Sequence, residues 1–141
     1  MAFHLQIKTL YLIHIMVVSI LLAEDDINLG FVIADQLKAE GFKVSLATDG
    51  VDALRRFNEH HYHLCIFDVM MPKKDGFAVL EEAKKLDVAT PIVIASNLSE
   101  TDIFDRAKAL GAKEMIVKSN TDIDTIIEKI TDVAGKYAQK T

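Results

Sequence analysis

Short apolar runs alternate along this chain with longer segments in which apolar residues recur every three or four positions. The runs predict strands over residues 17–23, 43–47, 63–68, 92–95 and 115–117. The periodic segments that follow the runs predict five amphipathic helices. Strands that alternate with helices form parallel sheets covered by helices on both faces. The pattern therefore predicts one α/β domain, a doubly wound sheet of five parallel strands with five helices.

The helical periodicity also predicts which side chains face the sheet. The expected inward residues are Ile27, Phe31, Ala34 and Leu37 in the first helix, Val51, Leu54 and Phe57 in the second, Phe77, Leu80 and Ala83 in the third, and Ile123, Ile126, Ile127, Ile130 and Val133 in the last. Helix ends have their own signals. Asp26 and Ser99 are the expected N-caps of the first and fourth helices, and Gly41 and Gly111 are expected to end them.

Two predictions compete for the first 23 residues. Residues 10–23 are almost wholly apolar, but they fall short of the roughly 20 residues that span a membrane. Residues 17–23 are also needed as the first strand. We therefore expect residues 1–15 to be an extension outside the domain, which covers residues 16–141. The alternatives are an added element that packs on the domain or on a second copy and, least favoured, a signal or membrane-spanning segment.

Composition sets the broad class of protein. Half of the 141 residues are apolar, which excludes an intrinsically disordered chain. The net charge is −5 and lysine and arginine form no cluster, so we expect no direct contact with nucleic acid. The single cysteine, Cys65, lies within a predicted strand. Core packing is its expected role, and one thiol forms no intrachain disulfide, which fits a reducing compartment.

Polar residues stand where the predicted strands end. They are Glu24, Asp25 and Asp26 after the first strand, Asp68 after the third, Ser96 and Asn97 after the fourth, and Lys118 after the fifth. The carboxyl ends of parallel strands meet at one edge of the sheet, where open α/β folds bind their ligands. Carboxylates held so close together raise one another's pKa values and favour a bound cation, and Mg²⁺ suits oxygen ligands of this kind.

This set of residues fits phosphoryl transfer. With Mg²⁺ and Lys118 beside it, Asp68 is suited to accept a phosphoryl group, because both cations neutralise charge that develops during the transfer. Ser96 is placed to donate a hydrogen bond to a phosphoryl oxygen. The alternative is that the acids only cap helix N-termini, where carboxylates are favourable in any case. That alternative suits Asp26, but it does not explain the whole ordered set.

Four motifs carry a resemblance to a known family. They are residues 21–26, residues 67–72 with Asp75 and Gly76, residues 91–96, and residues 111–113 leading to Lys118. Over about residues 17–138 the chain resembles the receiver domain of two-component response regulators, of the chemotaxis-regulator type. The resemblance implies a flavodoxin-like fold with strand order 2-1-3-4-5.

The resemblance also implies roles for single residues. Asp68 is expected to accept a phosphoryl group from a phosphohistidine, on a sensor histidine kinase or a phosphotransfer protein. Glu24 and Asp25 match the family's acidic pair, with Asp25 the closer match to the direct Mg²⁺ ligand. The backbone carbonyl of Met70 is expected to be a further ligand.

The chain matches the family at two more positions and departs from it at three. Ser96 matches the hydroxyl that moves onto the phosphoryl group, and Lys118 the lysine that pairs with it. Ser119 replaces the usual proline after this lysine, so we expect a trans Lys118–Ser119 bond, since a cis bond without proline costs roughly 2.5–4 kcal/mol. Met115 replaces an aromatic switch residue, which predicts a softer switch. Asn97 replaces a small residue, which narrows access to the site or adds a polar contact.

The residues beside the expected phosphoryl group predict its lifetime. Met70 and Leu98 occupy these positions and are both apolar. Neither side chain can orient an attacking water, so we predict slow self-dephosphorylation.

These observations favour a stand-alone cytoplasmic signalling domain that makes no contact with a membrane and catalyses only its own phosphorylation and dephosphorylation. Phosphorylation is expected to shift Ser96, Met115 and the face made by the fourth helix, fifth strand and fifth helix, which binds a downstream protein or forms a homodimer. One alternative is an interaction module that works without phosphorylation, if Asn97 and Ser119 disable the site. The other is an aspartate-nucleophile phosphatase, disfavoured because Met70 stands where such an enzyme has a second acid.

A group of histidines resembles a second metal site. His60, His61 and His63 follow the second predicted helix. We interpret them as solvated residues at a helix C-terminus, where cations are favourable.

Overall fold

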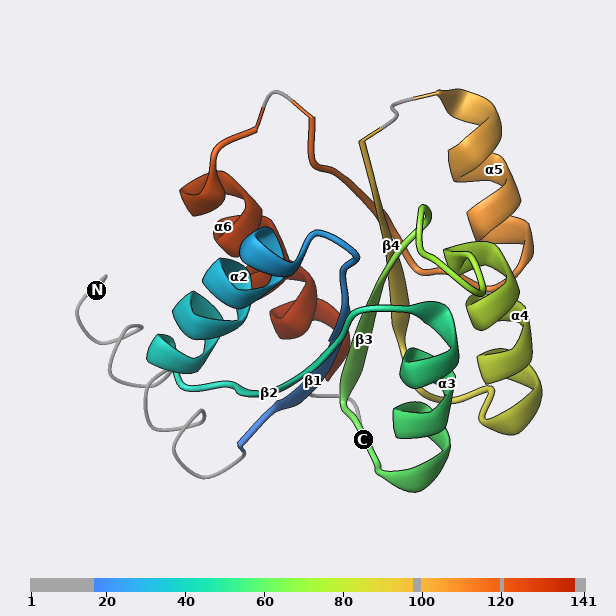
Figure 1. Cartoon of the computed structure of the whole chain (residues 1–141), viewed down its shortest axis with the longest axis horizontal. Helices are drawn as coiled ribbons and strands as arrows, with labels where there is room; N and C mark the ends of the chain where they lie inside the picture. The colour runs from blue at the N-terminus through green and yellow to red at the C-terminus, as the bar shows by residue number, and fades with distance from the viewer. Residues whose placement is uncertain (1–16, 98–99, 120, 139–141) are drawn as a thin grey trace.

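One five-stranded sheet forms the centre of the molecule (Figure 1). The computed structural model describes residues 17–97, 100–119 and 121–138. The strands are β1 (Ser19–Ala23), β2 (Lys43–Ala47), β3 (Leu64–Asp68), β4 (Ile92–Ser96) and β5 (Met115–Val117). Every neighbouring pair is parallel, and the order is β2-β1-β3-β4-β5. The predicted parallel sheet and its strand order are confirmed.

Helices cover both faces of the sheet. They are α2 (Ile27–Ala39), α3 (Gly50–Glu59), α4 (Gly76–Leu86), α5 (Thr101–Ala109) and α6 (Ile123–Val133), which continues into the short π-helical segment η1 (Ala134–Ala138). Figure 1 shows α2 and α6 against one face and α3, α4 and α5 against the other. The five predicted helices and the doubly wound architecture are therefore confirmed.

Burial on both faces explains why the central strands are apolar throughout. Every residue of β3 and β4 is buried. Along each strand the side chains alternate: Leu21 and Phe67 join the core beneath α3, α4 and α5, whereas Ile20 and Ile66 join the core beneath α2 and α6. Cys65 packs in the first of these cores, as expected, and burial raises the pKa of its thiol.

The predicted inward face of α2 is wrong for two residues. Ile27 and Phe31 are 55% and 58% exposed. The buried residues are Gly30, Ile33, Ala34 and Leu37. Helix α2 is apolar on several sides, so periodicity alone allowed more than one inward face. Close packing at Gly30 decides between them, because a Cβ there would lie 3.1 Å from Cδ1 of Leu46.

Helix α3 shows a similar rotation. Val51 is half exposed, contrary to the prediction, and Ala53 and Phe57 are the residues buried against the sheet. Leu54 is partly buried. The inward residues predicted for α4 are all buried, as are those for α6, apart from the partly buried Ile123.

Side-chain caps begin most of the helices. The capping residues are Asp26, Asp49, Asp75 and Asp122, and each accepts a hydrogen bond from the backbone N–H three residues further on. The role predicted for Asp26 is confirmed. Helix α5 begins at Thr101 with Glu100 at the N-cap and no side-chain hydrogen bond. The predicted cap, Ser99, lies outside the described residues.

Glycines with positive φ end two helices. Gly41 has φ 102° after α2, and Gly111 has φ 107° after α5. Both predicted helix ends are confirmed, because this left-handed conformation is accessible to glycine without strain.

One of the three histidines at the end of α3 holds the fold together through a hydrogen bond. His60 and His61 are exposed, as expected for a solvated helix end. His63 is partly buried, and its Nδ1 accepts a hydrogen bond of 2.9 Å from the backbone N–H of Ser19. Burial lowers the pKa of this imidazole, which keeps Nδ1 free to accept.

No helix in the described part of the chain is long and apolar enough to cross a membrane. Residues 1–15, predicted to be an extension, lie outside the described residues. Their role stays a prediction.

Candidate functional site

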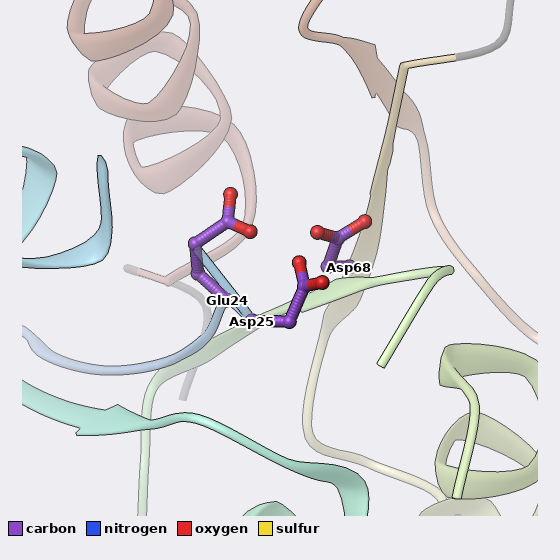
Figure 2. Close-up of side chains that lie close together, drawn as sticks. All are labelled: Glu24, Asp25 and Asp68. Atoms are coloured by element: carbon purple, nitrogen blue, oxygen red, sulfur yellow. The ribbon is translucent and has the colours of Figure 1, made fainter. Parts of the chain in front are cut away.

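Three carboxylates meet at the carboxyl edge of the sheet (Figure 2). Glu24 and Asp25 directly follow β1, and Asp68 is the last residue of the adjacent strand β3. The register pairs Ala23 with Phe67, so the acids that follow them lie at the same level. One oxygen from each carboxylate lies within 4.8 Å of the others. Glu24 and Asp68 are buried, whereas Asp25 is exposed to solvent.

Lys118 bridges the two buried carboxyl groups. Its Nζ lies 2.5 Å from Oε1 of Glu24 and 2.8 Å from Oδ2 of Asp68. Burial opposes the charged form of Lys118, but the hydrogen bonds with Asp68 and Glu24 outweigh it and raise the pKa of the ammonium. The site thus has a fixed cation before any ligand arrives.

The pKa of Glu24 is strongly raised in this site. Burial and the nearby carboxylate of Asp68 raise the pKa of Glu24 to about 8, although Lys118 acts in the opposite direction. Burial thus disfavours the charged form of Glu24 in this site.

The open side of the site lies at Met70. The backbone N–H of Met70 donates to Oδ1 of Asp68 at 3.3 Å, and its side chain is 63% exposed. The preceding residue, Val69, is fixed from both sides: its N–H donates to the carbonyl of Ala95 at 2.9 Å, and its carbonyl accepts from Gly76 at 2.9 Å. Asp68 is thus held rigidly at the base of an accessible loop.

Strand β4 brings Ser96 next to Asp68. The register pairs Asp68 with Ala95, the neighbour of Ser96, and Ser96 is fully buried. The backbone N–H of Lys118 donates to the carbonyl of Ser96 at 2.7 Å, so Ser96 also helps to position the lysine. Asn97 is exposed beyond the strand.

Met115 lies apart from the acidic cluster. It pairs with Ile94 in the sheet, two residues before the level of Ser96, and packs partly buried against the core beneath α4 and α5. Because residues two apart on a strand share a face, Met115 lies on the same side of the sheet as Ser96. Among the described residues no peptide bond is cis, so the Lys118–Ser119 bond is trans, as expected. Leu98 lies outside the described residues.

Two glycines set the geometry of the site without offering a functional group. A Cβ on Gly76 would lie 2.2 Å from the backbone oxygen of Asp68, and one on Gly50 would lie 1.9 Å from the backbone oxygen of Lys74. The start of each helix therefore presses on the loop that follows β3. Sequence reasoning assigned these glycines only to turns. The signal that marks them is an Asp–Gly pair at the start of α3 and α4.

The donor set fits Mg²⁺. Three carboxylates converge, a backbone carbonyl lies in the adjoining loop, and the cluster holds neither sulfur nor imidazole. Mg²⁺ prefers hard oxygen ligands, keeps several waters and is bound by few carboxylates. The chemistry that such a cluster offers is neutralisation of a phosphoryl group beside a carboxylate nucleophile.

A comparison with protein families identifies the family of this chain. Residues 20–131 match the family model of the response regulator receiver domain. The chain belongs to this family. Receiver domains are signalling domains of two-component systems that histidine kinases phosphorylate, and they generally bind Mg²⁺ at an acidic pocket. The predicted resemblance is confirmed.

Curated relatives of this receiver domain are regulators of transcription. The chain is 43% identical over 101 residues to the transcriptional regulatory protein RprY of Bacteroides fragilis. This alignment covers 70% of the chain and 42% of RprY. It is 34% identical over 129 residues to the transcriptional regulatory protein PdtaR of Mycobacterium tuberculosis. This alignment covers 84% of the chain and 62% of PdtaR. The chain thus spans less than half the length of RprY.

Solved structures agree on the fold. The receiver domain of the Francisella response regulator 1452 superposes with a TM-score of 0.75 at 27% identity, covering 84% of this chain and 97% of that one. The response regulator domain of Thermotoga maritima CheB gives a TM-score of 0.80 at 21% identity and covers 89% of this chain and 99% of that one. At that identity the likeness to CheB shows the fold alone.

Proposed function

We propose that this receiver domain accepts a phosphoryl group on Asp68 from a phosphohistidine of a sensor histidine kinase or a phosphotransfer protein, in a Mg²⁺-dependent reaction. One observation carries the proposal. Asp68 is a buried carboxylate at a strand end with the ammonium of Lys118 2.8 Å away and the carboxylates of Glu24 and Asp25 beside it. An isolated carboxylate is a poor phosphoryl acceptor, and this surrounding is what activates it.

The transfer exchanges one bond to phosphorus for another. A carboxylate oxygen of Asp68 attacks phosphorus, a P–O bond forms, and the P–N bond to the donor imidazole breaks with its electron pair going to the nitrogen. The ammonium of Lys118 then pairs with a phosphoryl oxygen. It is already hydrogen-bonded to Oδ2 of Asp68, so it needs only a small movement.

We assign the cation to the acidic cluster. The carboxylates of Glu24, Asp25 and Asp68 and the backbone carbonyl of Met70 are the proposed ligands. Mg²⁺ bound there supplies neutralisation of the phosphoryl oxygens. Glu24 and Asp68, the two partners of Lys118, would then also hold the cation.

The response to phosphorylation is assigned to β4 and β5. The hydroxyl of Ser96 donates to the phosphoryl group, and the side chain of Asn97 adds a polar contact at its edge. Movement of Ser96 changes the space available to Met115, which lies on the same side of the sheet. The face made by α5, β5 and α6 then binds a downstream protein or a second copy of the chain.

Exposed apolar residues next to the site suit it to dock a phosphodonor protein. Ile27 and Phe31 on α2 are more than half exposed, and α2 begins three residues after Glu24. Exposed aromatic and aliphatic side chains that adjoin a reactive group are typical of a protein interface. We assign the docking of the histidine donor to this first half of α2.

The other features of the proposed function are a cytoplasmic location and signalling through protein contacts, with no direct contact with nucleic acid or membrane. The net charge of −5 supports the absence of a nucleic-acid contact. Stand-alone action stays a prediction of the sequence, because the relatives are longer regulators.

Incubation with Mg²⁺ and acetyl phosphate, followed by intact mass, tests the proposal. We expect a phosphate-sized gain for the wild type that EDTA abolishes. Asp68→Asn removes the gain, and Asp102→Asn, which changes an exposed acid on α5, keeps it. No gain in the wild type, together with no binding of beryllofluoride, contradicts the proposal and favours an interaction module that works without phosphorylation.

A further inference from the structure

A cavity lies at the edge of the sheet opposite Asp68. Its volume is about 230 Å³, and its lining residues are Ser19, Lys43, Ser45, His60, His61 and Tyr62. Ser19 and Lys43 begin β1 and β2, and the other members come from β2 and from the segment after α3. Because the strands are parallel, their beginnings lie at the amino edge, a strand's length from the acidic cluster.

The polar side chains that line the cavity can all donate hydrogen bonds. Its accessible polar groups are two serine hydroxyls, one ammonium and two imidazoles, and the lining includes no carboxylate. Hydroxyls donate to oxyanions, an imidazole donates in either charge state, and an ammonium donates only. Asp87 lines a neighbouring cavity with His61 and Tyr62, but not this one. Such a lining is notable in a chain with a net charge of −5.

The polar groups of the wall residues differ in how accessible they are. Tyr62 is 5% exposed, and its hydroxyl is buried without a hydrogen bond to any described residue. Buried polar groups are nearly always paired, and an unpaired one is costly. The ammonium of Lys43 likewise forms no ion pair within the described ranges. The ammonium of Lys43 is therefore available to a ligand in the cavity, whereas the buried hydroxyl of Tyr62 is not reached by solvent.

The cavity wall is held in place before any ligand binds. The backbone of Ser19 donates to Nδ1 of His63 at 2.9 Å and accepts from the N–H of His63 at 2.8 Å. The N–H of Lys43 donates to the carbonyl of Val18 at 3.0 Å. The rings of His60 and Tyr62 meet edge to face with their centroids 6.3 Å apart. A preformed wall lowers the entropic cost of binding.

We propose that this cavity binds a phosphate group, either free or carried by a small phosphorylated metabolite. A phosphate has several acceptor oxygens and up to two negative charges, which match the hydroxyl, imidazole and ammonium donors of the wall. The volume accommodates a phosphate with space for a small organic group. This site is independent of phosphorylation at Asp68.

Titration of ¹⁵N-labelled protein with inorganic phosphate, followed by NMR, tests the proposal. EDTA is present to keep metal out of the acidic cluster, and ionic strength is held constant with sodium chloride. We expect saturable shifts of the backbone amides of Ser19, Ser45 and Tyr62, and the same affinity in Asp68→Asn. Unsaturable shifts, shifts equal to those from chloride, or shifts confined to other regions overturn the proposal.

A second titration with glycerol 3-phosphate separates the two sources of phosphate. Tighter binding than inorganic phosphate at the same amides indicates a phosphorylated metabolite. Equal or weaker binding at these amides indicates that the cavity takes the free ion.

Variants assign the binding to the cavity. Lys43→Gln and Ser45→Ala each remove a donor from the lining, and we expect each to weaken phosphate binding about tenfold. Lys38→Gln is the matched control, because it makes the same change of charge at an exposed residue of α2 outside the cavity. Equal weakening by Lys38→Gln shows a general charge effect and overturns the proposal. The dispersion of each variant's spectrum verifies that it is folded.

Discussion

Lys118 lies between two buried carboxyl groups, and its ammonium compensates their negative charge. The lysine and Glu24 are 94 residues apart in the sequence, yet Nζ and Oε1 lie 2.5 Å apart. Removing one member of such a cluster leaves the others buried without compensation. The same side chain therefore serves stability without the phosphoryl group and, in the proposed function, chemistry with it.

The first prediction concerns the stability that Lys118 provides. Lys118→Met keeps the length of the side chain but leaves Glu24 and Asp68 unpaired, so we expect a loss of about 3 kcal/mol in the free energy of unfolding. Urea unfolding in EDTA measures it. Lys113→Met, at an exposed lysine five residues earlier, is the control and should change stability little. A loss as small as that of the control contradicts the bridging role.

The second prediction concerns the lifetime of the phosphorylated state. Met70 is exposed at the open side of the site, and its thioether cannot orient an attacking water. An asparagine side chain can, so Met70→Asn should speed self-dephosphorylation about tenfold. Loss of the phosphate-sized mass over time gives the rate. Met70→Leu should decay like the wild type, and an unchanged rate in Met70→Asn counts against this role for position 70.

Whole elements are held at the site by close backbone contacts. Helix α4 begins at Gly76, against the carbonyl of Asp68, and helix α3 begins at Gly50, against the carbonyl of Lys74. Lys73, between them in the loop, has φ 68°, which is uncommon for a residue other than glycine. The loop after β3 is thus clamped by two helix starts.

The third prediction tests this clamp. In Gly76→Ala the added Cβ would lie 2.2 Å from the oxygen of Asp68, so the helix or the strand end must move. We expect a loss of about 2 kcal/mol in stability, measured by urea unfolding, and slower phosphorylation by acetyl phosphate. Gly135→Ala is the control, because nothing lies within 4 Å of its Cβ position. Equal behaviour of the two variants disproves the clamp.

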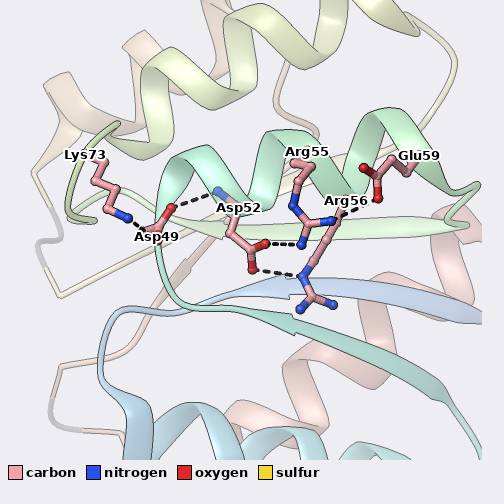
Figure 3. A network of polar contacts seen from close by, with 6 residues as sticks. All are labelled: Asp49, Asp52, Arg55, Arg56, Glu59 and Lys73. Carbon is pink, nitrogen blue, oxygen red and sulfur yellow. Dashed lines mark hydrogen bonds and ion pairs between the residues drawn. The ribbon is translucent and has the colours of Figure 1, made fainter.

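An ion-pair network runs along α3 (Figure 3). Asp52 binds Arg55 at 2.6 Å and Arg56 at 2.9 Å, and Arg55 also binds Glu59 at 3.0 Å. Partial burial opposes the effect, but the hydrogen bonds from Arg56 and Arg55 hold the pKa of Asp52 below its usual value. The two ion pairs of Asp52 therefore stabilise the helix only while Asp52 is ionised.

The fourth prediction is the pH dependence of this network. A carboxyl whose pKa is lower in the folded state contributes stability above its unfolded pKa and loses it as the pH falls. Asp52→Asn should therefore cost about 0.5 kcal/mol near pH 7, with the difference from the wild type shrinking as the pH falls below the unfolded pKa of 3.8. Thermal unfolding at several pH values measures the difference. A difference that persists at low pH shows that charge is not the cause.

In the molecule as a whole, the two edges of the sheet have opposite character. The carboxyl edge gathers acids around one lysine, and the amino edge gathers hydroxyls, imidazoles and a lysine around a cavity. The exposed apolar residues of α2 adjoin the carboxyl edge, where a protein donor approaches Asp68 in the proposed function.

The fifth prediction tests docking on α2. Phe31→Ser should slow phosphotransfer from a histidine phosphotransfer domain that phosphorylates the wild type by about tenfold, because an exposed aromatic anchor is lost. Phosphorylation by acetyl phosphate, which needs no docking, should be unchanged. Val88→Ser, at a residue 80% exposed beyond α4, is the control. Slowing by both donors alike places the defect in the site and contradicts docking.

The sequence sufficed for the architecture and for the members of the site. Alternation of strands and helices determines a parallel doubly wound sheet, and the strand-end rule then selects Glu24, Asp25, Asp68, Ser96 and Lys118 without knowledge of their contacts. Both predictions succeeded because they rest on local signals. Each strand, turn and helix cap is determined mainly by a few neighbouring residues.

The tertiary structure decided what depends on packing between distant segments. A helical repeat has a period but no fixed origin, so only packing at Gly30 and Gly50 settles that Phe31 and Val51 face outward. Packing also decides the bridge of Lys118 to Glu24 and the cavity at the amino edge of the sheet, whose lining residues come from three separate segments. Their distances follow from how the elements pack, which no local pattern encodes.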